Sequence, residues 1–133
     1  MFPLPALEVL GVDESTLGDD IRALPATAGV EIHSAYEPDR VLFVRSDQYN
    51  FIKRGVPALF PQIGYFRGSP EEKLAHEWTR VRYHSPADDA KQPIDPAAAA
   101  QFNDLQRELV LRIANANDRP SWKPESFFQR FAR

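Results

Sequence analysis

Apolar positions near the start of the chain recur with two different spacings. Residues 7–10 form a short, mostly apolar run, which predicts a strand. Leu17, Ile21 and Leu24 then follow at i, i+4 and i+7, so that one side of a helix collects them. Ser15 stands just before this pattern, at a position where serine is a favoured N-cap. The opening of the chain therefore predicts a strand followed by an amphipathic helix.

Three further segments have the composition of strands. Residues 30–33 alternate between apolar and polar side chains, as a half-buried strand does. Residues 41–44 and 56–60 are nearly continuous apolar runs, which are typical of strands buried on both faces. Between these two runs, Ser46 and Asp47 are expected to cap a short helix. With the first strand, the chain offers four strand candidates, enough for a small sheet.

The second half of the chain is mainly helical in pattern. A loop over 61–70 leads to a helix over 71–78, and residues 79–94 again have the character of a loop. The longest helix starts after Asp95, an N-cap residue followed by proline, and its apolar positions recur every three or four residues. The segment 119–133 is rich in aromatic residues, so we expect it to dock on the body rather than extend into solvent.

Length and composition fit one globular domain over residues 1–133. Apolar residues make up 43% and charged residues 26%, as in ordinary globular proteins. Strands that alternate with helices predict an α/β fold, with helices packed on a small mixed sheet. The net charge of −3 argues against a nucleic-acid surface built on bulk charge, and no apolar run approaches the roughly 20 residues of a membrane span. Because cysteine is absent, disulfides, thiolate zinc sites and cysteine nucleophiles are excluded.

His84 is the residue whose surroundings best suit chemistry. It lies in a predicted loop and is followed by Asp88 and Asp89. An exposed imidazole there can bind a metal ion or carry a proton, and either carboxylate could orient the ring through its second nitrogen. The simpler interpretation is a surface residue in a turn. The other histidines, His33 and His76, are expected on the surface of a strand and of a helix.

Asp47 is the second candidate, because it follows the apolar run 41–44. In open α/β sheets, ligands gather outside the carboxyl ends of the strands. The alternative interpretation is the helix cap described above. Motifs of other chemistries are missing, since the sequence contains no HExxH zinc motif, no Gly-rich phosphate loop and no Gly-x-Ser-x-Gly nucleophile motif. Spacing alone therefore leaves the role of both candidates open.

Three stretches of the chain carry motifs that also occur, in the same order, in a known family. They are Arg45-Ser46-Asp47-Gln48-Tyr49-Asn50-Phe51, Lys53-Arg54-Gly55-Val56-Pro57-Ala58-Leu59 and Arg82-Tyr83-His84-Ser85-Pro86-Ala87-Asp88-Asp89. In their order and spacing they resemble the C-terminal part of the zinc-dependent aminopeptidases of metallopeptidase family 28, whose fold glutaminyl cyclases share. Segments 15–19 and 122–128 look like those of bacterial members of the same group.

This resemblance implies a pair of zinc ions that activate water to hydrolyse the N-terminal peptide bond, with a glutamate as general base. His84 falls on the last metal-ligating histidine of the family. Asp47 falls on an aspartate that lines the active site and joins its hydrogen-bond network. Gln48 and Asn50 stand where many members have histidine and proline. The family's other ligands and its general base lie upstream of the matching segment, so the chain is expected to be the C-terminal portion of a catalytic domain and to be inactive alone.

Two other interpretations stay open. One is a non-enzymatic remnant module that binds a partner or peptide without metal, and the other is a glutaminyl-cyclase-like acyltransferase with a single zinc ion. A peptide substrate is the partner expected of the complete enzyme, with no nucleic acid and no membrane. An uncovered sheet edge is expected to cause self-association or to be covered by the chain's own N-terminal segment. Family members are often periplasmic or secreted, whereas residues 1–5 lack the features of a signal peptide, which leaves the compartment open.

Overall fold

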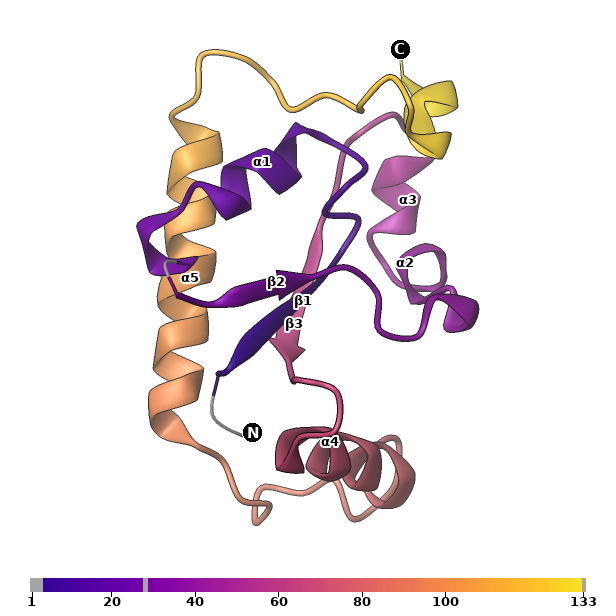
Figure 1. Ribbon diagram of the computed structural model, residues 1–133. Coiled ribbons are helices and arrows are strands. Elements are labelled where there is room, and N and C mark those ends of the chain that lie inside the picture. Colours follow the sequence, from indigo (N-terminus) through magenta and orange to yellow (C-terminus); the bar gives the residue numbers. More distant parts are fainter. Residues whose placement is uncertain (1–3, 28, 133) are drawn as a thin grey trace.

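A three-stranded mixed sheet lies at the centre of the fold. The computed structural model describes residues 4–27 and 29–132. Strand β1 (Ala6–Leu10) is the middle strand, parallel to β2 (Glu31–His33) and antiparallel to β3 (Phe60–Gly64). In this described part of the chain, the α-helices are α1 (Thr16–Arg22), α2 (Leu42–Arg45), α3 (Tyr49–Ile52), α4 (Pro70–Val81) and α5 (Pro96–Ala114). The fold is therefore mixed α/β, as the sequence predicts (Figure 1).

The main hydrophobic core lies between β1 and the helices α1 and α5. Leu7 and Val9 of β1 are fully buried and pack with Ile21 of α1 and with Leu105 and Leu109 of α5. Burying each such side chain stabilises the fold by roughly 1.5–3 kcal/mol. Figure 1 shows α1 and α5 together on one side of the sheet. The apolar faces that the sequence predicts for these helices are thus the faces that build the core.

The helix starts predicted at Ser15 and Asp95 are confirmed, but only Asp95 caps its helix through its side chain. The Asp95 carboxylate accepts hydrogen bonds from the N–H groups of Ala97 and Ala98 at 2.9 and 3.0 Å. Pro96 occupies the first turn of α5, where its missing donor costs nothing. Ser15 is the N-cap residue of α1, yet its side chain makes no capping hydrogen bond and is buried.

The aromatic tail docks on the body, as predicted, and forms a second core cluster. Trp122 and Phe128 are buried together with Ile52 of α3. The indole N–H of Trp122 donates to the carbonyl oxygen of Gly55 at 3.2 Å, so the polar edge of this buried ring is also satisfied. The tail therefore covers α3 and closes the end of the fold opposite α4 (Figure 1).

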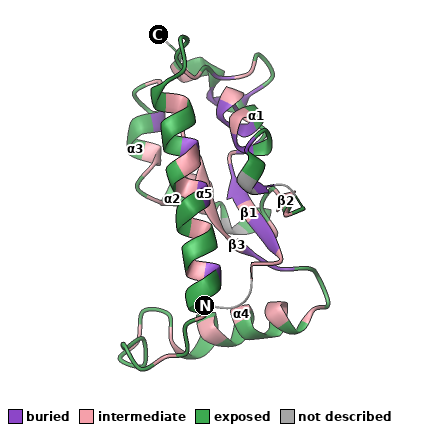
Figure 2. Ribbon diagram, turned by 90° about the vertical axis from the view of Figure 1, so that its left-hand side faces the viewer, coloured by how far each residue is buried: buried purple, intermediate pink, exposed green. Residues whose placement is uncertain are grey.

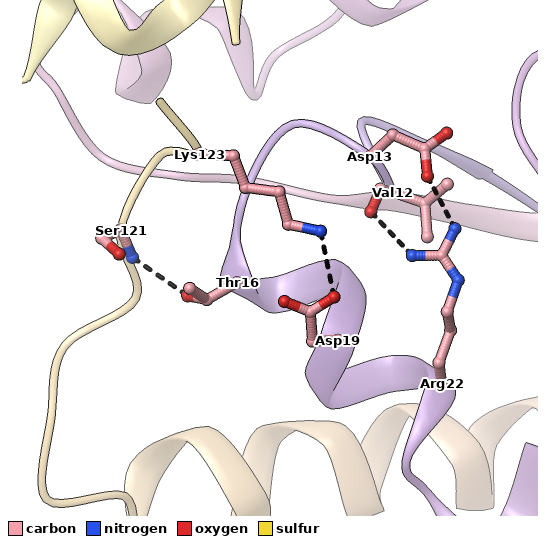
Figure 3. Close-up of polar contacts among 7 residues, drawn as sticks. All are labelled: Val12, Asp13, Thr16, Asp19, Arg22, Ser121 and Lys123. Atoms are coloured by element: carbon pink, nitrogen blue, oxygen red, sulfur yellow. Dashed lines mark hydrogen bonds and ion pairs between the residues drawn. The ribbon is translucent and has the colours of Figure 1, made fainter. Parts of the chain in front are cut away.

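Polar contacts also fix the tail to α1. The N–H of Ser121 donates to the hydroxyl oxygen of Thr16 at 3.1 Å, and the ammonium of Lys123 lies 3.0 Å from Asp19 (Figure 3). Arg22, at the end of α1, reaches back to the loop that precedes the helix (Figure 3). Exposed ion pairs of this kind contribute about 0–1 kcal/mol each, so the buried aromatic rings are the stronger anchor of the tail.

The apolar run 41–44 is mainly helical, so the prediction of a strand over these residues is wrong. Val41 has φ 49°, in the left-handed region, and helix α2 begins at the next residue. Both edges of β1 are occupied by β2 and β3, so this run has no place beside the central strand. Phe43 and Val44 instead pack, half-buried, against the second core cluster. A short apolar run does not by itself distinguish a buried strand from a helix.

The last strand lies later in the chain than predicted. The apolar run 56–60 stays outside regular structure until Phe60, and pairing with β1 continues to Gly64, through residues that the sequence predicts as loop. The length of β1 sets these limits, because Phe60 pairs with Leu10 and Gly64 with Ala6. The described sheet therefore has three strands, not the four that the sequence predicts.

Helix α4 extends beyond its predicted end and packs differently from the other helices. The hydroxyl oxygen of Ser69 caps it by accepting the N–H of Glu72 at 3.2 Å. No residue of α4 is buried, in contrast to β1 and α1 (Figure 2). None of the described helices combines the length and apolar character needed to cross a membrane. Helix α4 therefore forms a separate layer at one end of the sheet.

Candidate functional site

His84 lies in the turn that follows α4 and is exposed to solvent. Its backbone has φ 56°, in the left-handed region, which is uncommon for a residue other than glycine. Its ring stacks on that of Tyr83, with ring centroids 3.8 Å apart and planes inclined by 21°. The N–H of Ser85 donates to the carbonyl oxygen of Arg82 at 2.9 Å and closes the turn around His84. This local structure leaves the imidazole accessible to a ligand.

The two aspartates that follow His84 have other partners. The carboxylate of Asp88 accepts the side-chain amide of Gln92 at 2.6 Å, and that of Asp89 accepts the N–H of Lys91 at 2.9 Å. Among the described residues, neither carboxylate hydrogen-bonds the His84 ring. Both aspartates therefore order the loop after α4 rather than orient the imidazole.

Asp47 lies in the turn between α2 and α3, with its side chain exposed. The N-cap of α3 is Gln48, so the predicted capping role of Ser46 and Asp47 is wrong. The Gln48 side chain donates instead to the carbonyl oxygen of Phe43 at 2.8 Å. The carbonyl oxygen of Asp47 accepts the N–H of Asn50 at 3.2 Å, whereas its carboxylate has no hydrogen-bond partner in the described part of the chain. The carboxylate is thus accessible, but not beside a strand end.

The structure does not bring His84 and Asp47 together. The α2–α3 turn and helix α4 lie in different parts of the molecule, with α4 at the far end of the sheet (Figure 1). Across residues 4–27 and 29–132, no group of three or more histidine, aspartate and glutamate side chains could hold a metal ion. A zinc site needs about three protein ligands. The described side chains therefore do not fit a metal centre by themselves.

A row of polar residues crosses the three strands of the sheet, and the sequence patterns do not predict it. Glu8 of β1 lies opposite His33 of β2 and Gln62 of β3 in the strand register. The Glu8 carboxylate accepts the backbone N–H of Tyr36 at 2.7 Å and the side-chain amide of Gln62 at 2.8 Å. The signal that could have revealed this row is the charge of Glu8 itself, within the otherwise apolar run 7–10. A carboxylate in a central strand needs partners, and the neighbouring strand supplies one of them.

Two stacked tyrosines extend this row. The Tyr36 hydroxyl donates to the carbonyl oxygen of Tyr65 and accepts the Tyr65 N–H at 3.1 Å, while the ring centroids lie 4.4 Å apart. Burial, and then the negative charge of groups such as Glu8, raise the pKa of both hydroxyls above the usual value of 10.0. Both phenols therefore stay protonated at neutral pH, and that of Tyr36 acts as a structural donor. His76 of α4 joins them, with Nε2 3.4 Å from the Tyr65 hydroxyl.

Two hollows open near the carboxyl ends of the parallel strands β1 and β2. The larger, of about 400 Å³, is lined by residues 10–14, by the loop after β2, by α2 and by Phe128. The smaller, of about 330 Å³, is lined by residues 33–36 and Arg67. Ligands of open α/β sheets bind in a crevice of this kind. Both hollows are therefore lined by residues other than His84 and Asp47.

The model of the protein family described as Peptidase family M28 matches the chain over residues 4–110. The match covers the sheet, helices α1 to α4 and most of α5, and it includes both Asp47 and His84. The aromatic tail lies outside it. No curated protein and no solved structure matches the chain.

Proposed function

The chain belongs to peptidase family M28, and from that membership we propose that it contributes His84 to the metal centre of a zinc-dependent aminopeptidase. Family membership supports a peptidase-type function. The observation that carries the finer proposal is that one continuous family match runs through the stretches that contain Asp47 and His84. The proposed substrate is a peptide, which the complete enzyme would cleave after its first residue.

In this proposal, His84 is a zinc ligand. Neutral imidazole is a common zinc ligand, and the His84 ring is exposed at the surface of its turn. Asp47 has the more indirect role of joining the hydrogen-bond network around the assembled site. Because the described side chains do not form a metal centre, we derive no catalytic step for the chain alone. The remaining ligands and the general base have to come from other residues than those described.

A first experiment tests the proposed inactivity of the chain alone. The purified 133-residue chain is incubated with an aminoacyl-p-nitroanilide and added zinc, and release of nitroaniline is followed. We expect no turnover above that of buffer with zinc. Zinc-dependent turnover by the wild-type chain that disappears in His84→Ala would show that the chain assembles a working site by itself.

A second experiment tests the role of His84. Residues 4–110 replace the corresponding segment of an active M28 aminopeptidase, and the chimera is compared with its His84→Ala and Asp47→Ala variants. We expect His84→Ala to lower kcat/KM at least about a hundredfold, because even residues that only support a metal ligand cost about 10–100-fold when lost. Asp47→Ala should have a smaller effect. His76→Ala is the matched control and should leave activity unchanged.

Equal activity and equal zinc content of the chimera and its His84→Ala variant would contradict the assignment of His84. No observation favours the non-enzymatic module or the cyclase over the peptidase. The outer edges of β2 and β3 have no partner strand in the described sheet, so self-association through a sheet edge stays a prediction.

A further inference from the structure

The turn that carries Asp47 joins two helices that are too short to be stable by themselves. Helices α2 and α3 have four residues each. Isolated helices shorter than about 12–15 residues are marginal in water, so packing against other segments has to hold both of them. Val41, just before α2, has φ 49°, a strained conformation for a β-branched residue that persists only where neighbouring contacts hold it. The position of Asp47 therefore depends on what α2 and α3 pack against.

Both short helices pack against rings of the aromatic tail. Ile52 of α3 is fully buried in one cluster with Trp122 and Phe128. Phe43 of α2 meets the ring of Phe128 edge-on, with centroids 5.4 Å apart and planes inclined by 76°. The hydrogen bond from the Trp122 indole to the carbonyl oxygen of Gly55 fixes the chain just past α3. The turn with Asp47 thus lies between two helices that both rest on the tail.

The backbone of the tail is itself fixed to the loop before α1. The N–H of Thr16 donates to the carbonyl oxygen of Ser121 at 3.0 Å, and the N–H of Lys123 donates to the carbonyl oxygen of Glu14 at 2.9 Å. Between these two bonds, Trp122 forms an antiparallel bridge with the N-cap residue of α1. Backbone pairing of this kind sets the depth at which the Trp122 ring enters the cluster. The tail therefore connects the body of the molecule to α2 and α3.

The cluster around the tail rings is separate from the main core. Among the described residues, the main cluster contains none from the tail, α2 or α3, whereas the second cluster draws on all three. Phe43 has one further contact, with the turn after β1, where its ring lies so close that a Cβ on Gly11 would come within 2.3 Å of it. Loss of a tail ring should therefore loosen α2 and α3 while the sheet stays packed on α1 and α5.

From these contacts we infer that the aromatic tail, which lies beyond the family match, is a positioning element of the candidate site. Trp122 and Phe128 are positioning residues, because they act through the turn that presents the Asp47 carboxylate to solvent. The inference rests on the role proposed for Asp47. It extends the functional unit from residue 110, where the family match ends, through the tail to residue 132.

Hydrogen exchange of the full chain tests the positioning without any need for activity. The backbone N–H groups of residues 52–55 are hydrogen-bonded to carbonyl oxygens of residues 48–52. Phe128→Ala empties a buried position of the second cluster and should speed exchange of these amides at least about tenfold. The amides of β1 and α5 should keep their protection, since the described main cluster has no tail residue.

Three further variants control for the kind of change. Phe128→Leu keeps an apolar side chain of similar size and should give a much smaller increase in exchange. Trp122→Phe loses the hydrogen bond to Gly55 but keeps an aromatic ring, so its increase should also be small. Phe127→Ala removes the same ring as Phe128→Ala from the adjacent position, which is 57% exposed, and should leave exchange of residues 52–55 unchanged.

A spin label reports on position 47 itself. The chain contains no cysteine, so Asp47→Cys provides a single thiol for the label. Phe128→Ala should increase the mobility of this label in its electron paramagnetic resonance spectrum. A label attached through Val110→Cys, at a position of α5 that is 63% exposed, should keep its spectrum. A general loss of stability would change both spectra.

Activity shows whether this positioning serves the chemistry. In the chimera with an active M28 aminopeptidase, extended from residue 110 to residue 132, Phe128→Ala should lower kcat/KM. When Asp47→Ala is already present, Phe128→Ala should lower kcat/KM no further, because it acts through Asp47. Equal losses from Phe128→Ala with and without Asp47→Ala would show that the tail does not act through Asp47.

Two results on the full chain would also overturn the inference. One is a Phe128→Ala variant in which exchange of residues 52–55 and mobility of the label at position 47 stay as in the wild type. The other is an equal rise of exchange in β1, α3 and α5, which is expected if the tail only stabilises the fold as a whole. Failure of the proposed function is a different outcome, in which Asp47→Ala and His84→Ala leave the chimera fully active.

Discussion

The body of the molecule and the α4 segment, residues 66–95, are stabilised in different ways. The body holds two buried clusters, one around Leu7 and Leu105 and one around Ile52 and the tail. No residue of α4 is buried, and none of the segment belongs to either cluster. Hydrophobic burial therefore stabilises the body, whereas the segment depends on local polar contacts and on its caps.

This difference bears on the proposed site because His84 lies in the α4 segment, which has few buried contacts. Its turn is held by Arg82, whose guanidinium donates to the carbonyl oxygen of Ala87 at 2.8 Å, and by Trp78, whose indole donates to Gln92 at 2.8 Å. Segments with few buried contacts open locally more readily than core strands. The position of His84 is thus set by contacts that a partner can reorganise at small cost, while the sheet keeps its form.

The largest expected effect on the free energy of unfolding distinguishes the body from the α4 segment. Leu105→Ala empties a fully buried position between β1 and α5 and should lower the free energy of unfolding by about 3 kcal/mol. Leu74→Ala makes the same change at an exposed position of α4 and should stay within about 0.5 kcal/mol. Urea unfolding at low protein concentration measures both. Equal losses would mean that α4 shares the core.

An intermediate effect is expected where the segment joins the body. Tyr36→Phe removes the hydroxyl that bonds both backbone groups of Tyr65 and should cost about 1–2 kcal/mol. Because the pKa of this hydroxyl is raised in the folded chain, the unfolded chain loses its proton first as the pH rises. The stabilisation is therefore fully present below about pH 10 and is lost above it.

Urea unfolding at several pH values from 8 upward checks this second prediction. The wild-type chain should lose stability more steeply above about pH 10 than the Tyr36→Phe variant. Tyr83→Phe, which alters an exposed tyrosine in the α4 segment, is the control and should follow the wild-type curve. If the stabilities of the wild type and of Tyr36→Phe fell in parallel as the pH rose, the predicted link to ionisation of Tyr36 would be wrong. A constant difference between the two curves would still reflect the lost hydrogen bonds.

The smallest effect concerns the caps of the two long helices. Ser69→Ala and Asp95→Ala each remove a side-chain cap worth about 1 kcal/mol. Because no residue of α4 is buried, Ser69→Ala should speed hydrogen exchange of the α4 amides and leave global unfolding nearly unchanged. Asp95→Ala should lower global stability, because α5 is part of the main core. Global destabilisation by Ser69→Ala would show that α4 unfolds together with the body.

Patterns over a few neighbouring residues correctly predicted the helices that are set by apolar spacing and by caps. The spacing of Leu17, Ile21 and Leu24 predicts the buried face of α1, and Asp95 with its following proline predicts the start of α5; both are confirmed. The run 41–44 was ambiguous, because its conformation depends on whether a strand edge is free beside it. The polar row was missed for a related reason, since Glu8 and Tyr36 are 28 residues apart and meet only across the sheet.

The sequence by itself determined that this chain has a mixed α/β fold and belongs to peptidase family M28, because amphipathic spacing, caps and motif order are properties of local sequence. It also singled out His84 and Asp47, although their roles stay proposals. Only the tertiary structure decided how many strands the described sheet has, which run became a helix and that α4 stays outside both core clusters. Those outcomes depend on which surfaces compete for burial, and that competition exists only once distant segments have come together.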